Sequence, residues 1–222
     1  MKYAVLIIAV LLGYIVASVF TKNKVKHISL YLAFSGAFLL SVTLFELLPE
    51  VFENLDGNPG LYIMGGILIQ IGLEYFSRGA EHGHVHLSTD KQAFPLVLLI
   101  SLSVHALIEG FPISHANNLL WGIVIHKIPV AIVLSFFFIK AKYSKTTTLI
   151  FLTIFAAMTP LGTLLMDVSP MLYTYQFEIA AIAIGIFLHV STTILFESSK
   201  DHSFNLSKVL VILFAVVLAY FL

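Results

Sequence analysis

Residues 104–131 read VHALIEGFPISHANNLLWGIVIHKIPVA, and in this stretch two apolar segments meet through a short polar break. The first segment carries His105 and Glu109, four positions apart, so both side chains lie on one face of a helix. The second segment carries His126 and Lys127. Ionisable side chains are costly inside an apolar membrane span and usually mark a functional site. Imidazole and carboxylate groups on two facing helices predict a metal site.

The composition of the whole chain indicates an integral membrane protein. Of the 222 residues, 59% are hydrophobic and 11% are charged, whereas soluble domains have about 45–50% apolar and about 25% charged residues. The formal net charge is zero, so nothing favours a nucleic-acid partner. The chain has no cysteine, which excludes disulfides and thiolate metal ligands.

The apolar runs predict an all-α protein with eight membrane spans and one domain, residues 1–222. Each run approaches or exceeds the roughly 20 residues that cross a bilayer. The first run lacks a small-residue cleavage site and is expected to be a span rather than a signal peptide. The eight predicted spans are 3–20, 28–48, 60–77, 93–112, 117–139, 146–166, 171–196 and 205–222.

The positions of the lysines and the arginine predict the orientation. With eight spans, the loops that follow spans one, three, five and seven share one side of the membrane. Ten basic residues fall on that side: Lys22, Lys24, Lys26, Arg78, Lys91, Lys140, Lys142, Lys145, Lys200 and Lys208. Of the twelve Lys and Arg residues, only Lys2 lies on the other side, and Lys127 is inside a span. The positive-inside rule therefore predicts that both termini are outside.

The predicted depths bring the two histidines of the opening stretch to one level. His105 is ten residues after Pro95 and His126 is nine residues after Asn117. At about 1.5 Å per residue, each lies about 15 Å into the bilayer, close to its midplane. Substrate sites of secondary transporters are typically found at this level, between helices interrupted by proline and glycine.

These residues resemble the ZIP (Zrt-/Irt-like) family of metal-ion transporters. The similarity covers the second to the seventh predicted span in the correct order. The stretches that carry it are ELLPE at 46–50, HGHVH at 82–86, HALIEG at 105–110, HKIP at 126–129, TPLG at 159–162 and GIFLH at 185–189.

The resemblance implies a fold of eight helices in a 3+2+3 bundle with inverted repeats. It implies a transporter rather than an enzyme, with uptake of a divalent cation, typically Zn²⁺ with Fe²⁺ or Mn²⁺ as alternatives, and no separate cofactor. The metal ligands carried over are His105, Glu109 and His126. Family members are often dimers, so a homodimer is an open alternative. In a bacterium the expected location is the cytoplasmic membrane.

Four positions depart from the pattern of family members that have a two-metal centre. Ala106 stands where such members carry Asn, and Lys127 and Val130 replace acidic or other ligands of the fifth span. Thr159 replaces a Glu of the sixth span. These departures predict a single-metal site in which the Lys127 ammonium takes the place of the second metal and balances Glu109.

Other polar residues are candidates for the path of the ion. Glu46 and Glu50 are expected at an acidic outer entrance, because acidic groups concentrate cations locally. The candidates for the inner exit are His189, Glu197, His82, His84 and His86. Each of these has a plainer alternative as a solvated or interfacial side chain, and short histidine tracts are compositional signals only.

Two other functions stay open at this level. An intramembrane metal-dependent hydrolase also needs a buried polar metal site with an activated water. The chain has no H-E-x-x-H motif and no serine or cysteine nucleophile at motif spacing from a base, which disfavours this alternative. A membrane scaffold or metal sensor of the same fold is the third option.

Overall fold

The structure, a computed structural model, describes residues 2–20, 28–77, 94–114, 117–197 and 205–221. Within these ranges every regular element is helical. In chain order they are α1 (Lys2–Phe20), α2 (Ile28–Val42), the π-helical turn η1 (Thr43–Leu47), α3 (Leu48–Asn54), α4 (Pro59–Ser77), α5 (Leu96–Gly110), the 3-10 turn η3 (Phe111–Ser114), α6 (Asn117–Lys140), α7 (Lys145–Val168), α8 (Pro170–Thr174), α9 (Gln176–Glu197) and α10 (Leu206–Tyr220).

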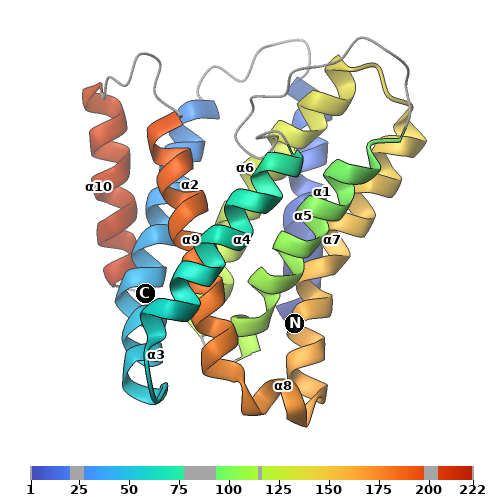
Figure 1. Ribbon diagram of the computed structural model, residues 1–222. Coiled ribbons are helices and arrows are strands. Elements are labelled where there is room, and N and C mark those ends of the chain that lie inside the picture. The colour runs from blue at the N-terminus through green and yellow to red at the C-terminus, as the bar shows by residue number, and fades with distance from the viewer. Residues whose placement is uncertain (1, 21–27, 78–93, 115–116, 198–204, 222) are drawn as a thin grey trace.

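Six helical segments of the described chain are long and apolar enough to cross a membrane. They are α1, the continuous run from α2 to α3, α5 with η3, α6, α7 and α9. The two remaining predicted spans correspond to α4, which carries Gln70 and Glu74 among its apolar residues, and to α10, which is 15 residues long. The protein is therefore a multi-pass helical membrane protein. Both termini lie toward the same end of the bundle (Figure 1).

The second predicted span is longer than the sequence indicated. A break was expected at Pro49, but the helix continues to Asn54. The backbone N–H of Leu48 donates to the carbonyl of Thr43, five residues back, which is the π-helical register. Pro49 follows directly in the first turn of α3, where a missing N–H is tolerated. The predicted end at residue 48 was wrong because the π-helical turn places Pro49 in the first turn of the next helix, where a proline does not end the helix.

The seventh predicted span was wrong at its beginning. It was expected to run from residue 171, but α8 ends at Thr174 and Tyr175 leaves the helical conformation (φ −103°, ψ 24°) before α9 begins. The Ser169 side chain accepts a hydrogen bond from the Leu172 N–H and caps α8. This serine cap makes a separate short helix favourable, and the membrane-length segment starts at Gln176.

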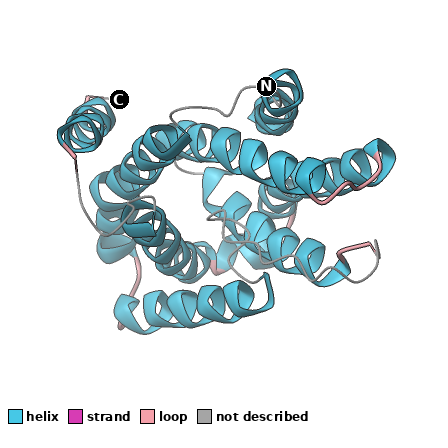
Figure 2. Cartoon of the chain, turned by 90° about the horizontal axis from the view of Figure 1, so that it is seen from above, coloured by secondary structure: helices cyan, strands magenta, loops and turns pink. Residues whose placement is uncertain are grey.

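The helices pack in two groups. In the first group, α1 packs against α6 and α7, and α5 packs against α7. In the second group, α4 packs against α9, and α2 packs against α9 and α10. The groups meet where α2 contacts α6 and where α4 contacts α5. Seen from above, the helices that carry the two termini lie at the periphery of the bundle (Figure 2).

Close packing of α5 on α7 depends on a pair of glycines. A Cβ added at Gly110 would lie 2.2 Å from the Thr159 carbonyl oxygen, and one added at Gly162 would lie 2.1 Å from the Leu107 carbonyl oxygen. Neither distance is sterically allowed, so only glycine lets the two backbones approach this closely. This close contact holds the C-terminal end of α5 against α7. Gly110 is the residue that follows Glu109.

Candidate metal centre

Three side chains with metal-ligating atoms meet between α5 and α6. His105 and Glu109 come from one face of α5, and His126 comes from α6. One potential ligand atom from each residue lies within 4.8 Å of the others. All three side chains are buried, with 3%, 1% and 3% of their surface exposed. Two imidazoles and a carboxylate at this separation can converge on one divalent cation.

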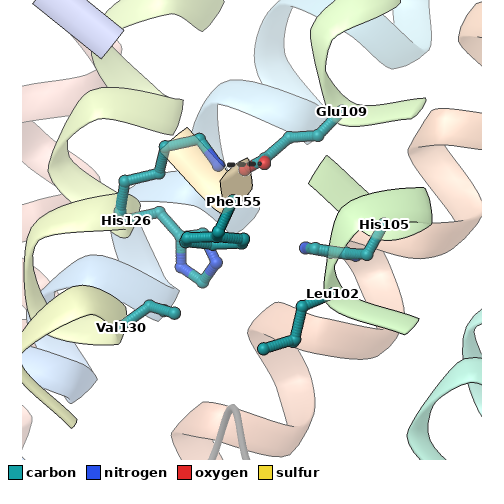
Figure 3. A pocket seen from close by; sticks show the side chains of 7 residues that line it. Leu102, His105, Glu109, His126, Val130 and Phe155 are labelled. Atoms are coloured by element: carbon teal, nitrogen blue, oxygen red, sulfur yellow. Dashed lines mark hydrogen bonds and ion pairs between the residues drawn. The ribbon is translucent and has the colours of Figure 1, made fainter. Parts of the chain in front are cut away.

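The three residues line a small cavity. The other lining residues are Lys127, Val130, Leu102 and Phe155. The cavity has room for roughly one water molecule. His105 points into this space from α5, and His126 and Phe155 face it from the opposite side (Figure 3). The cavity therefore fits one ion-sized body.

A lysine forms an ion pair with the carboxylate of this cluster. The Nζ of Lys127 lies 2.8 Å from Glu109 Oε2, and both side chains are 1% exposed. The ammonium also lies over the Phe155 ring, 4.7 Å from its centroid, at a distance typical of a cation–π contact. A buried charge without a partner is strongly destabilising. The pair therefore keeps the cluster neutral when no metal ion is bound.

The environment of the second carboxylate oxygen of Glu109 differs from that of the first. Oε1 is buried and makes no hydrogen bond to any residue that the structure describes. Buried carboxylate oxygens are normally satisfied, and an exception calls for a ligand or a functional reason. This oxygen belongs to a residue that lines the cavity between the two histidines. Its chemistry fits a cation as the missing partner.

Two side chains from the other group of helices contact the histidines. Gln70 Oε1 of α4 lies 3.0 Å from His105 Nδ1, and Ser35 Oγ of α2 lies 3.5 Å from His126 Nδ1. Sequence reasoning missed both residues. The only available signal for Gln70 was a polar amide in the middle of an apolar predicted span.

The four positions that depart from the two-metal pattern have other contacts in the structure. Ala106 is fully buried, and its carbonyl accepts a hydrogen bond from the Thr159 hydroxyl at 2.9 Å. Val130 is 3% exposed and closes one side of the cavity. The Thr159 hydroxyl thus ties α7 to α5, and Lys127 supplies the positive charge next to Glu109.

The two acids expected at the outer entrance lie apart from the three-residue cluster. Glu46, in η1, accepts a hydrogen bond from Asn118 Nδ2 at 2.6 Å. Glu50, in α3, lines a second cavity together with Leu47, Pro112, Gln176, Phe177 and Ala180. This cavity includes Pro112 of η3, the turn that follows α5, so Glu50 lies at the end of the bundle toward which α5 runs.

Of the residues expected at the inner exit, His189 has a described side chain. Its Nε2 lies 2.5 Å from Glu74 Oε2, and the pair joins α9 to α4 at side-chain exposures of 20% and 25%. Sequence reasoning missed Glu74, which is four residues after Gln70 and shares its helix face. Glu197 ends α9, and its side chain lies outside the described residues, as do His82, His84 and His86.

Comparison with known proteins places the chain in a family. No curated protein matches it. The family model described as ZIP zinc transporter matches residues 80–222, which is more than half of the chain. The matched range includes α5, α6 and all three residues of the His/Glu cluster. The resemblance seen in the motifs is confirmed by this match, and the chain belongs to the ZIP zinc transporter family.

Proposed function

We propose that this protein moves Zn²⁺ across the membrane into the cytosol, and that the ion binds in the cavity between α5 and α6. Membership of the family makes the chain a divalent metal transporter. The zinc preference, the direction and the site are our proposal. The observation that carries it is the convergence of His105, Glu109 and His126, with their ligand atoms within 4.8 Å of one another.

The donor set suits a transported ion. Imidazole nitrogen and carboxylate oxygen are ordinary Zn²⁺ ligands, and Fe²⁺ or Mn²⁺ accept similar sets. Three protein ligands leave coordination positions for water, whereas four protein ligands are typical of permanent structural zinc. An incomplete shell favours release of the ion, since a transported ion has to leave its site as readily as it enters.

Lys127 adjusts the strength of this site. A dication that binds Glu109 comes close to the ammonium, which opposes it electrostatically. Binding therefore requires the ammonium to give up part of its contact with Glu109, while the Phe155 ring, 4.7 Å from the ammonium, continues to stabilise its charge. We infer that Lys127 replaces a second metal ion and keeps the affinity low enough for turnover.

We also propose eight passes in a 3+2+3 arrangement with inverted repeats and both termini outside, which adds α4 and α10 to the six membrane-length segments. The distribution of lysines supports this orientation. Lys2 is the single basic residue predicted outside. Its Nζ lies 2.7 Å from Asp167 Oδ2 near the end of α7. The eight-pass topology predicts the outer side for Asp167 as well.

The whole chain is proposed to form one domain, and in a bacterium the membrane is the cytoplasmic one. A homodimer stays a prediction of the family resemblance.

The path of the ion follows from the polar residues on either side of the cavity. Glu46 and Glu50 are proposed to attract the cation at the outer end, near the cavity that Glu50 lines. The half-buried pair of His189 and Glu74 is proposed to receive it on the inner side. Movement of the group that contains α5 and α6 relative to α2 and α4 is proposed to open the two ends in turn. The extensive packing of α1 on α6 and of α4 on α9, each within one group, supports this division.

Uptake of divalent cations into sealed vesicles tests the proposal. Purified protein in proteoliposomes is expected to take up Zn²⁺, and Glu109→Ala or His105→Ala is expected to abolish uptake while expression is retained. Glu178→Ala, which removes a carboxylate from the first turn of α9, serves as the matched control. Normal uptake by Glu109→Ala would contradict the site. Lipid or peptide cleavage without ion flux would favour the hydrolase, an alternative that family membership disfavours.

A further inference from the structure

Gln70 is a buried amide inside the bundle and lies next to a proposed ligand. It is in the middle of α4 and is fully buried, at 0% exposure. Burying an amide in an apolar environment is unfavourable unless it forms hydrogen bonds. Its Oε1 lies 3.0 Å from Nδ1 of His105, which is on α5. The amide thus approaches the ring nitrogen at a normal hydrogen-bond distance.

The chemistry of this contact determines the state of the histidine. A carboxamide oxygen only accepts hydrogen bonds, so His105 Nδ1 must be the donor. In a neutral imidazole the lone pair then lies on Nε2, which becomes the atom that can bind a metal ion. Metal-ligating histidines commonly donate their other ring N–H in this way, and the partner fixes both the tautomer and the ring orientation.

The contacts of Gln70 and Ser35 with the two histidines differ in length and in chemistry. The corresponding contact of His126, to Ser35 Oγ, is 3.5 Å long, and a hydroxyl can donate or accept. It therefore does not impose one tautomer. The Gln70 contact thus specifies the tautomer of His105, which the Ser35 contact by itself does not do for His126.

We propose that Gln70 is a positioning residue for metal binding. It holds His105 with Nδ1 protonated and with Nε2 directed at the ion, and it acts from the group of helices that does not carry the ligands. This inference rests on the proposed function and adds a residue to it. Because α4 and α5 belong to different groups, the strength of the metal site depends on how closely those groups are packed. A shift of α5 away from α4 removes the acceptor from His105 and weakens the site, which favours release.

The chain offers a control for ordinary helix packing. Ser101, one turn before His105 on α5, donates to the carbonyl of Leu73 on α4 at 2.5 Å. This hydrogen bond joins the same two helices without contacting either histidine. Ser101→Ala therefore removes a polar contact between α4 and α5 and leaves the Gln70–His105 hydrogen bond in place.

The test is equilibrium Zn²⁺ binding to purified full-length protein, measured by competition with a chromophoric chelator. Gln70→Met keeps the length of the side chain and removes the amide oxygen, and we expect about 10-fold weaker binding, the lower end of the range for loss of such a partner. Gln70→Glu keeps an acceptor and is expected to bind at least as well as the wild type. Ser101→Ala is expected to bind as the wild type does.

A second measurement reads the tautomer directly. The ¹⁵N NMR spectrum of histidine-labelled protein distinguishes the two neutral tautomers, and the His105 signals are assigned by their loss in His105→Asn. We expect the Nδ1–H tautomer in wild type and Gln70→Glu, and a mixture in Gln70→Met. The proposal is wrong if Gln70→Met matches the wild type in affinity or tautomer, or if Ser101→Ala weakens binding equally. If the wild type and His105→Ala bind Zn²⁺ alike, the proposed function itself fails.

Discussion

The chain contains two histidine–carboxylate arrangements, and their surroundings differ. The cluster of His105, Glu109 and His126 is almost completely buried, and it includes a carboxylate oxygen that forms no hydrogen bond within the part of the chain that the structure describes. The pair of His189 and Glu74 is about one quarter exposed, and its two members contact each other at 2.5 Å. A buried donor set gains most from binding a cation, whereas a partly exposed pair whose members already contact each other gains less. Histidine and glutamate side chains are thus suited to selective binding of a cation in the buried cluster and to transient contact with it at the pair of His189 and Glu74.

The largest effect is expected where the buried cluster loses its carboxylate. Glu109→Gln removes the only negative charge among the three proposed ligands and should abolish Zn²⁺ uptake into proteoliposomes. It also leaves the Lys127 ammonium buried without its counter-ion, which destabilises a protein by about 3–5 kcal/mol. The double variant Glu109→Gln with Lys127→Met should recover the thermal stability but not the uptake. Recovery of uptake in the double variant would contradict the ligand role.

The next effect concerns the Lys127 ammonium, which lies 2.8 Å from Glu109 in the buried cluster. Lys127→Ala should tighten Zn²⁺ binding at equilibrium, by about 10-fold or 1.4 kcal/mol, because the bound dication no longer faces a positive charge. Maximal uptake should fall, since a tighter site releases its ion more slowly. Chelator competition measures the affinity, and initial rates at saturating Zn²⁺ measure the uptake. Weaker equilibrium binding in Lys127→Ala would be inconsistent with this role.

A smaller effect is expected at the pair of His189 and Glu74. His189→Ala should lower the maximal uptake rate by about two- to fivefold, because an exit residue affects how fast the ion leaves, and exposed charge contacts contribute only about 0–1 kcal/mol. Zn²⁺ affinity at the central site should stay unchanged. Thr193→Ala, one turn further along α9, is the control. A loss of equilibrium affinity in His189→Ala would mean that the two arrangements form one site.

The difference between the two regions also shows what sequence can predict. His105 and Glu109 could be paired from the sequence because four-residue spacing on a helix places them together whatever the tertiary structure is. Placing His126 beside them required only two consecutive helices that run in opposite directions. The partners of His105 and His189 could not be found in this way. Gln70 and Glu74 come from α4, and their contacts depend on the packing of helices that no local pattern specifies.

The fold follows the same division. The positions of most helices were predictable because long apolar runs separated by polar breaks define them. The two errors in helix boundaries arose from local backbone chemistry. The π-helical turn before Pro49 lets the helix continue to Asn54. The non-helical conformation of Tyr175 separates α8 from α9, and Ser169 caps the start of α8. Neither feature changes the average hydrophobicity of its segment, so the apolar pattern did not reveal it. The division of helices into two groups also depends on tertiary contacts alone.

The smallest effect is expected at the outer entrance, where Glu50 lines a cavity but contacts none of the proposed ligands. Glu50→Gln should raise the Zn²⁺ concentration for half-maximal uptake by about twofold at low ionic strength, because a single partly exposed charge only concentrates cations locally. The difference should disappear in about 0.5 M salt, where the screening length is well under 10 Å. Maximal uptake should match the wild type, and Glu53→Gln, on the exposed side of α3, is the control. An effect that persists at high salt would place Glu50 among the residues that bind the ion directly, and the buried cluster would then not be the only selective site.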